Sequence, residues 1–319
     1  MVRALVFALA ASLAPGAFAQ YPSRPLHLVV GFAPGGASDI ISRAMSEPLA
    51  RSFGQPIIVD NKPGAGSSLA AELVAKSAPD GYTVMIASPS AVFVNPIIMK
   101  NVNYVTERDF APVTLVTTSP LVVAVHPSVP AGTLRELIDY AKKNPGKLNF
   151  ATSGNGSAPH LGTVLLESLT GVHMVHVPYK SGGLAVQSVL AGDTQLTIAT
   201  PPSVLPQVKA GRLRGLAMTS AERSPLVPEL PGMKEAGVDG YNYTFWYGMF
   251  APAGTPRAVI NRLFDATATA LKDPKLKQIL ATDGTETAPS KSPEEFGTWL
   301  RDEGKLWARL VKESGAKVD

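Results

Sequence analysis

The sequence predicts an α/β protein of two domains, each built on a mostly parallel sheet. A short aliphatic run, a Gly/Pro/Ser turn and an amphipathic stretch follow one another repeatedly, as in residues 26–32, 33–38 and 39–53. This order is typical of a strand, a loop and a helix that covers the sheet. In addition, the 300 residues that follow the first 19 of the 319-residue chain exceed what one hydrophobic core usually serves.

The first 19 residues indicate a secretory signal peptide. A short basic start at residues 1–3 precedes an apolar run at residues 4–13, and Ala17-Phe18-Ala19 supplies the small residues of a cleavage site. The apolar run is shorter than the roughly 20 residues that cross a bilayer, and no later stretch approaches that length. We therefore expect an exported chain that begins at Gln20 and is found in the periplasm.

The remaining elements follow from the same patterns. Strands are expected at residues 26–32, 56–59, 82–87, 121–125, 148–151, 174–177, 195–198 and 244–250. Helices are expected at residues 39–53, 67–77, 159–169, 183–191, 256–271, 274–281 and 293–314, and proline opens the last three. Pro48 lies inside the first helix and predicts a kink or two helical pieces, since it cannot donate an internal hydrogen bond.

The composition argues against several classes of function. Without cysteine, the chain has no disulfide framework, thiolate nucleophile, cysteine metal site or lipid-anchored cysteine. The net charge of +4, or +3 once Arg3 is removed, is too small to indicate nucleic acid. His27 and His126 lie in apolar strands, and His173 and His176 point to opposite faces of one strand. We therefore expect no metal site and no cofactor.

Two glycine-rich loops are placed to hold an anion. Residues 32–39 and 151–160 each follow an apolar strand and precede a helix, one in each half of the chain. Glycine lets backbone N–H groups point inward, the helix N-terminus adds about half a positive charge, and hydroxyls add donors. A carboxylate can then be bound without arginine. A third turn, at residues 61–68, is either a packing turn or a further ligand contact.

The loops carry no nucleotide or hydrolase motif. Gly154-Asn155-Gly156 lacks the third glycine of a dinucleotide fingerprint, no Walker lysine follows the glycines, and no serine lies in a G-x-S-x-G elbow. His160, in the first turn of the helix after the second loop, either reaches a bound anion or packs. Trp246, in the alternating aromatic run 241–247, either packs within a sheet or walls a ligand pocket.

Eight separate motifs follow one another in a distinctive order and spacing. They are residues 21–25 (YPSRP), 34–36 (PGG) with Asp39, 61–66 (NKPGAG), 79–82 (PDGY), 153–156 (SGNG) with His160, 175–180 (VHVPYK), 219–224 (TSAERS) and 251–256 (APAGTP). With this set the chain resembles, over essentially its whole mature length, the Bug family of substrate-binding proteins associated with tripartite tricarboxylate transporters.

The resemblance implies a type II periplasmic binding fold, in which crossing strands join two lobes and a ligand cleft lies between them. Lobe 1 is expected at residues 20–120 and 225–319, and lobe 2 at residues 121–224. The implied function is a monomeric, non-catalytic periplasmic receptor. It captures a small carboxylate and delivers it to the membrane permease subunits of a tripartite tricarboxylate-type transporter.

The expected ligand-binding residues come from both loops and from neighbouring strand ends. In lobe 1 they are Phe32, Ala33, Gly35, Gly36, Ala37, Ser38, Asp39, Ser88 and Ser90. Toward lobe 2 they are Ser153, Gly154, Gly156, Ser157, His160, Tyr179, Ala199, Thr200 and Trp246. The resemblance implies that backbone N–H groups of the first loop hold one carboxylate, partly through ordered water, and that the second loop approaches it from the other lobe.

Two departures from the family pattern bear on specificity. Ala199-Thr200-Pro201-Pro202 stands where the family often has an acidic residue and an asparagine, and Ser181 intervenes before Gly182-Gly183. An apolar wall predicts an aromatic or short aliphatic carboxylate, because a buried ammonium would lose its hydration there without a partner.

Two alternative functions stay open at this stage. A sensor kinase in place of the permease would leave the same binding site in use. An exported hydrolase or lyase would use His160 with a glycine-loop oxyanion site, although no nucleophile or base partner for it is found in the sequence.

Overall fold

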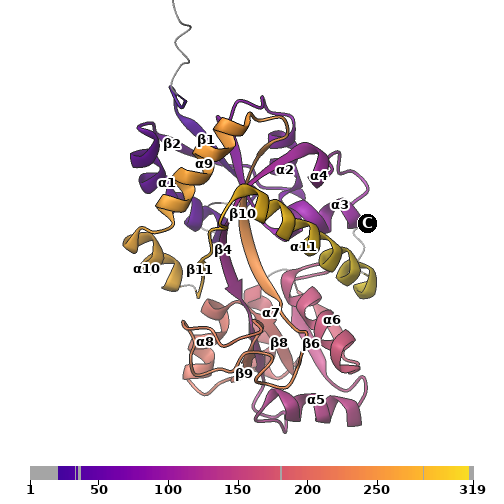
Figure 1. The fold of residues 1–319 in the computed structure, drawn as a ribbon. Coiled ribbons are helices and arrows are strands. Elements are labelled where there is room, and N and C mark those ends of the chain that lie inside the picture. The colour runs from indigo at the N-terminus through magenta and orange to yellow at the C-terminus, as the bar shows by residue number, and fades with distance from the viewer. Residues whose placement is uncertain (1–20, 33, 35–36, 180–181, 283, 316–319) are drawn as a thin grey trace, which may run out of the picture.

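The computed structural model describes residues 21–32, 34, 37–179, 182–282 and 284–315, and it contains two sheets, each with helices on both faces (Figure 1). The first sheet has six strands in the order β11-β4-β10-β3-β1-β2, and the second has five in the order β7-β6-β8-β5-β9. Residues 33, 35 and 36, which belong to the first glycine loop, and residues 1–20 lie outside the described residues.

The first sheet is covered by helices that are distant in sequence. Its strands are β1 (Leu26–Val30), β2 (Ile57–Asn61), β3 (Thr83–Ala87), β4 (Phe110–Pro120), β10 (Thr244–Pro252) and β11 (Glu286–Thr287). One face packs on α1 (Ala37–Phe53), α9 (Arg257–Ala270) and α10 (Pro274–Thr282). The other face packs on α2 (Ser68–Ala75), the π-helical turn η2 (Ser90–Val94) and α11 (Pro293–Ser314). Three short helices complete this lobe: η1 (Ala65–Ser67), α3 (Asn95–Ile98) and α4 (Thr106–Asp109).

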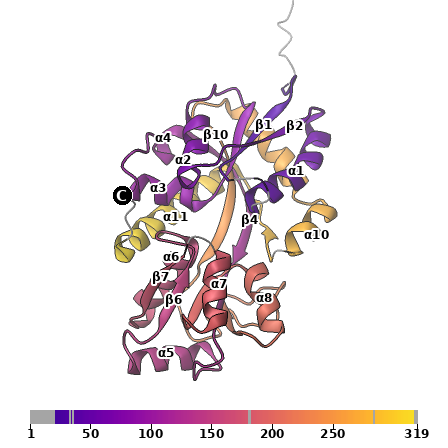
Figure 2. The same cartoon turned by 180° about the vertical axis from the view of Figure 1, so that it is seen from behind.

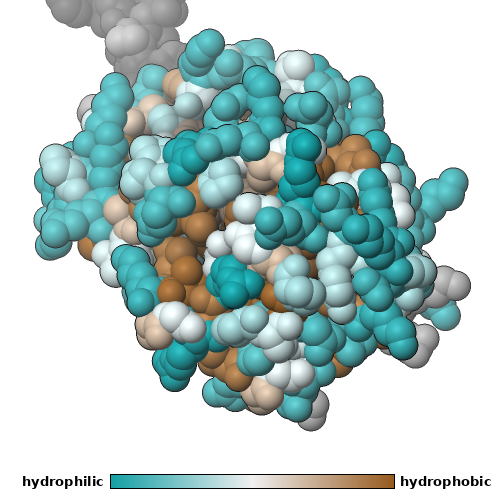
Figure 3. Space-filling view, turned by 90° about the horizontal axis from the view of Figure 1, so that it is seen from below, coloured by the Kyte–Doolittle hydropathy of each residue, from teal (hydrophilic) through white to brown (hydrophobic). Residues whose placement is uncertain are grey.

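The second sheet is built in the same way. Its strands are β5 (Val122–Val125), β6 (Asn149–Thr152), β7 (Val175–Pro178), β8 (Leu196–Ala199) and β9 (Arg214–Met218). The helices α5 (Leu134–Lys143) and α6 (Ala158–Thr170) cover one face, and α7 (Gly182–Ala191) and α8 (Pro201–Lys209) cover the other. Hydrophilic side chains cover most of the surface seen from below, with apolar surface showing between them (Figure 3). Within the described residues, no helix combines the length and the apolar composition that crossing a membrane requires.

Strand directions make the carboxyl edges of the two sheets face each other. Because β10 is antiparallel to both β3 and β4, β4 runs in the same direction as β1 and β3. At Pro120 the strand β4 leaves the first sheet, and Val122 begins β5 of the second. Val122 pairs with Ala199 at the end of β8, and β6 and β7 run parallel to β8. The strands of both sheets that lead into helices therefore end toward the opposite lobe (Figures 1 and 2).

The segment 225–243, which the sequence assigns to lobe 1, contacts the second sheet instead. Met218 N–H donates to Pro231 C=O over 2.8 Å, and Met233 N–H donates to Ser220 C=O over 2.9 Å. Val227 is buried in the core that α7 and α8 form with this sheet. We therefore propose that lobe 2 extends to residue 243, where β10 begins and returns the chain to the first sheet.

Most expected elements occur within two residues of their predicted ends, but two expectations differ from the structure. The helix α1 is continuous from Ala37 to Phe53 across Pro48, so the expectation of two helical pieces is wrong. Trp246 is fully buried, and its ring packs edge to face on Phe93, Phe296 and Trp299. Trp246 therefore belongs to the core under α11, which corrects the expectation that it walls a ligand pocket.

A buried carboxylate fixes α11 to this core. Glu303 accepts a hydrogen bond from the indole N–H of Trp246 over 2.9 Å and another from that of Trp307 over 2.8 Å. Burial raises the pKa of Glu303, and the two indole donors partly oppose this shift. Trp246 lies on a strand that crosses between the lobes, so this contact ties the C-terminal helix to the junction.

Replacing Glu303 with alanine is expected to lower the free energy of unfolding by about 3 kcal/mol, because two buried indole N–H groups lose their acceptor. Chemical denaturation monitored by tryptophan fluorescence would measure the change. Asp302→Ala is the matched control, since Asp302 is 74% exposed on the same helix and pairs only with Lys305. Equal small losses in both variants would contradict the assigned role of Glu303.

Candidate functional site between the facing sheet edges

The facing edges of the two sheets gather most of the predicted ligand-binding residues. We define the facing edges by the described residues 32, 34, 37–39 and 88–90 of the first lobe and 153–160, 179, 182 and 200–203 of the second. Each segment follows the carboxyl end of a strand and leads into the first turn of a helix, namely α1, η2, α6, α7 or α8. The positive ends of these helix dipoles therefore point into the space between the lobes.

The local charges favour an anion at this place. No acidic residue occurs in the first turn of η2, α6, α7 or α8. The first turn of α1 contains Asp39, but that residue is 3% exposed and its charge is paired. Its carboxylate accepts from Arg43 Nε over 2.9 Å and from Asn61 Nδ2 over 3.0 Å. The helix termini are thus left without a local negative charge that would compete with a bound carboxylate.

Asp39 acts on the framework of the first loop. A carboxylate has only acceptor oxygens, so Asp39 cannot donate to an anionic ligand. Its bonds instead connect the start of α1 with the end of β2, where Asn61 also donates to Phe32 C=O over 3.0 Å. We infer that Asp39 sets the entry angle of α1 and leaves the backbone N–H groups of Ala37 and Ser38 to meet a ligand.

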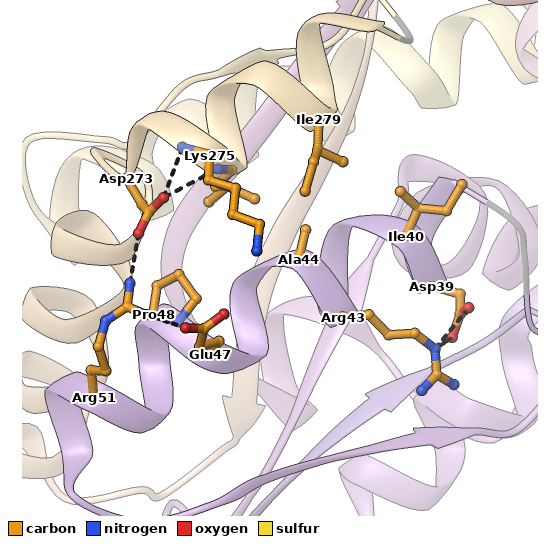
Figure 4. A pocket seen from close by; sticks show the side chains of 11 residues that line it. Asp39, Ile40, Arg43, Ala44, Glu47, Pro48, Arg51, Asp273, Lys275 and Ile279 are labelled. Atoms are coloured by element: carbon orange, nitrogen blue, oxygen red, sulfur yellow. Dashed lines mark hydrogen bonds and ion pairs between the residues drawn. The ribbon is translucent and has the colours of Figure 1, made fainter.

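A pocket of about 460 Å³ lies beside this ion pair, between α1 and α10 (Figure 4). Arg43 pairs with Asp39 at one end of it, and Arg51 pairs with both Glu47 and Asp273 at the other. Each acidic group that lines this pocket is therefore already paired with a guanidinium group. It flanks α1, and its described lining residues include none of the serine or glycine residues expected to bind the ligand.

The other first-lobe residues take different positions. Phe32 is 37% exposed, whereas the Ser38 side chain is buried beside the Tyr247 phenol, which lies beneath the start of α1. Ser88 is 1% exposed, its hydroxyl has no hydrogen-bond partner, and its carbonyl accepts from Ala91 N–H in η2. Ser90 is half-buried at the start of η2. Ala33, Gly35 and Gly36 lie outside the described residues.

The turn at residues 61–68 has the contacts of a packing turn. Asn95 Nδ2 donates to Gly66 C=O over 2.7 Å and to Ser68 Oγ over 2.9 Å, which holds the turn against α3. A Cβ on Gly31 would lie 1.6 Å from Ser67 Oγ, so only glycine permits this close approach at the end of β1. The sequence offered no signal for Asn95, because nothing in its neighbourhood relates it to a turn thirty residues earlier.

Alternate N–H groups of the second glycine loop are already hydrogen-bonded. Gly154 N–H donates to Thr152 Oγ1 over 3.1 Å, and Gly156 N–H donates to His160 Nδ1 over 3.0 Å. The N–H groups of Ser153 and Asn155 make no hydrogen bond to any described residue. The predicted donors Gly154 and Gly156 are therefore engaged by the protein, and their neighbours Ser153 and Asn155 are free to bind an anion.

The second loop approaches the first lobe at Gly156. Gly156 has φ +69°, and a Cβ there would lie 3.1 Å from Ile98 Cδ1 and 3.3 Å from Val94 Cγ1. Ser157 stays within its own loop, where its hydroxyl donates to Gly154 C=O over 2.7 Å. Gly156 thus allows close contact of the two facing edges beside the second glycine loop.

His160 does not line the facing edges with its ring. It is 4% exposed, and its ring stacks on that of His176 with 4.0 Å between centroids. Burial and, to a smaller degree, the neighbouring His176 lower the pKa of His160 to about 4. The ring is therefore neutral at pH 7, as its role as acceptor for Gly156 N–H requires. A direct contact between His160 and a ligand is not supported.

The remaining second-lobe residues differ in their exposure. Tyr179 is half-buried, and its hydroxyl donates to Ser188 Oγ over 2.6 Å, away from the second loop. Ala199 is 4% exposed and packs in the core that α7 and α8 cover, which corrects its assignment to the ligand wall. Thr200 is exposed at the start of α8. Pro201 meets the first lobe, since a Cβ on Gly284 would lie 2.6 Å from Pro201 Cβ.

Two lobes joined by crossing strands, with helix N-termini collected at their facing edges, define a solute-binding protein of the two-lobed α/β class. The chain belongs to the tripartite tricarboxylate transporter family receptors, whose family model matches residues 41–316. A protein encoded in the tcbD-tcbE intergenic region of Pseudomonas sp. strain P51 is 38% identical over 92% of this chain and 87% of its own length. BugT of Bordetella pertussis is 35% identical over 99% of this chain and 97% of its own length.

Solved structures of similar proteins agree with this assignment. A periplasmic transporter protein shares 39% identity and a TM-score of 0.76, over 94% of this chain and all of the other. An R. palustris protein solved with adipate shares 33% identity and a TM-score of 0.78, over 93% of this chain and all of the other. MatC from Rhodopseudomonas palustris, solved with bound malate, shares 30% identity and a TM-score of 0.74, over 91% of this chain and all of the other.

Acid is expected to destabilise the fold through His160. The pKa of His160 is about 4 in the folded protein, whereas that of a free histidine side chain is 6.5, so the unfolded state binds more protons between these values. The free energy of unfolding therefore falls as the pH drops from about 6.5 toward about 4. Thermal melts at about pH 7 and about pH 4.5 should show a larger drop in Tm for the wild type than for His160→Asn. Equal drops in Tm for the wild type and His160→Asn would show that His160 does not cause the loss of stability in acid.

Proposed function

We propose that this chain binds a small carboxylate between its two lobes and closes around it. The observation that carries the proposal is the set of helix N-termini on both facing edges, where the acid in the first turn of α1, Asp39, is already paired. In this arrangement backbone N–H groups can hold an anion without an arginine. The adipate and malate bound to the two related R. palustris proteins support a carboxylate as the ligand.

The ligand we propose is an aliphatic dicarboxylate. N–H groups that make no hydrogen bond to a described residue occur on both edges, at Ala37 and Ser38 in the first lobe and at Ser153 and Asn155 in the second. A ligand with one anionic group at each end would engage both pairs. An aromatic ligand stacked on Trp246 is no longer supported, since that side chain is buried in the core.

The wider role follows from family membership. We propose that the chain is exported to the periplasm by residues 1–19 and delivers its ligand, as a monomer, to the permease subunits of a tripartite transporter. We also propose that it is not an enzyme. Thr152 Oγ1 lies 2.6 Å from His176 Nε2, a hydroxyl and imidazole pair of the kind that nucleophilic catalysis uses, but Thr152 is 0% exposed and cannot meet a substrate.

A thermal-shift screen followed by calorimetry tests the ligand class. Malate, succinate and adipate should raise the Tm, because a ligand that binds only the folded state stabilises it by mass action. Their diamides serve as the matched control and should have no effect. Binding of the diamides, or of no dicarboxylate, would contradict the proposed ligand class.

Gly156→Val is expected to weaken dicarboxylate binding by about tenfold or more, because the added side chain meets Val94 and Ile98 and holds the lobes apart. Gly171→Val is the matched control. Gly171 has φ +70° against +69° for Gly156, but a Cβ there has nothing within 4 Å. Both variants should lose similar stability from backbone strain, and only Gly156→Val should lose affinity in calorimetry. Unchanged affinity in Gly156→Val would show that ligand binding does not depend on the close contact at Gly156.

A further inference from the structure

A stack of three rings lies beneath the second glycine loop. The rings of Phe150 and His176 are 4.9 Å apart between centroids, and those of His176 and His160 are 4.0 Å apart at an interplanar angle of 9°. Phe150 is on β6, His176 on the neighbouring strand β7, and His160 in the first turn of α6. Three elements that surround the loop are thus joined by one stack.

Each histidine of the stack is connected to one glycine of the loop. His160 Nδ1 accepts from Gly156 N–H over 3.0 Å. His176 Nε2 lies 2.6 Å from Thr152 Oγ1, and the same hydroxyl oxygen accepts from Gly154 N–H over 3.1 Å. Both histidines therefore hold backbone N–H groups that a ligand would otherwise compete for.

The hydrogen bonds of Gly154 and Gly156 determine which backbone N–H groups of the loop stay available to a ligand. Gly154 and Gly156 turn their N–H groups toward the imidazole stack, and the intervening Asn155 and preceding Ser153 keep theirs free. Gly154 and Gly156 have φ +117° and +69°, which glycine adopts as readily as negative φ. Because glycine is also free to adopt other conformations, the two hydrogen bonds favour this one.

We propose that His160 and His176 are positioning residues for anion binding, which fix the second glycine loop from behind and aim the N–H groups of Ser153 and Asn155 at the ligand. This inference rests on the proposed function for its consequence, but the geometry of the loop can be tested without any ligand. Neither histidine touches the ligand. The pair acts by removing the alternative backbone conformations of residues 153–157.

Burial favours the neutral form of both stacked histidines. A pocket of about 430 Å³ opens on the side away from the loop, and its titratable lining groups are Glu167, His173 and Glu313 together with the two stacked histidines. Glu167 accepts from Met174 N–H over 2.7 Å, and burial raises its pKa. Burial also lowers the pKa of His176. The acceptor state of His160 is therefore kept at neutral pH and lost in acid, when Nδ1 gains a proton.

The first experiment measures the amide hydrogen exchange of Gly156 by NMR in the ligand-free protein. His160→Leu removes the acceptor and keeps an apolar side chain, whereas His160→Asn places an amide oxygen near the position of Nδ1. Gly156 N–H should be protected in the wild type and in His160→Asn and should exchange about tenfold faster in His160→Leu, as expected for one lost hydrogen bond. Thr152→Val should have the same effect on Gly154 N–H.

The second experiment measures malate affinity in the same variants by calorimetry. His160→Leu should bind about tenfold more weakly than the wild type, and His160→Asn should restore most of the loss. A merely structural role would weaken both variants alike, since both lose the ring stack. The ratio of wild-type to His160→Asn affinity should also fall as the pH approaches about 4, because protonation of Nδ1 removes the acceptor in the wild type alone. Protonation of the ligand affects both proteins equally and so cancels in the ratio.

The two experiments fail in different ways. If the wild type binds no dicarboxylate, the proposed function is wrong, and the exchange of Gly156 N–H still decides whether His160 holds the loop. If Gly156 N–H exchanges at the same rate in His160→Leu and the wild type, the positioning role is overturned. Equal malate affinities in the wild type and His160→Leu would overturn it as well.

Discussion

The direction of strand β4 determines the position of the candidate binding site. Strand β4 runs parallel to β1 and β3 and passes at Pro120 directly into β5 of the second sheet. Because β8 pairs antiparallel with β5, the strands β6, β7 and β8 end toward the first lobe. In a parallel α/β sheet, loops and helix N-termini follow the carboxyl ends of the strands. The crossing of β4 therefore places both sets of loops opposite each other.

This geometry makes an anion site out of backbone groups. The helix termini at the facing edges supply partial positive charge, and the one acid among their first turns, Asp39, is neutralised by Arg43. Backbone donors cannot be removed by side-chain substitution, so the proposed binding of a carboxylate would rest on the fold itself. Differences in ligand among relatives must then come from the side chains and contacts that bound the space, such as Pro201 against Gly284.

Backbone donors must also be held in place, and here the two lobes differ. In the first lobe, Asp39 and Asn61 tie the start of α1 to the end of β2. In the second lobe, the contacts lie behind the loop, where His160 accepts from Gly156 N–H and His176 contacts the Thr152 hydroxyl that accepts from Gly154 N–H. The neutral imidazole serves this purpose well, because it can accept a hydrogen bond inside a buried stack without carrying a charge.

The sequence by itself determined the alternation of strands and helices, the two glycine loops at the start of helices, and the absence of any nucleotide motif. These features are local, since hydrophobic period and glycine spacing act over a few residues.

Tertiary structure decided the orientation of side chains. Strand β10 is covered on both faces, by α11 on one and by α1 and α9 on the other, so its alternating aromatic residues have no exposed face and Trp246 is core. Ala199, at the end of β8, is buried for the same reason. The partnership of His176 with Thr152 depends on the pairing of β6 with β7, a contact between residues 24 positions apart that no local pattern records.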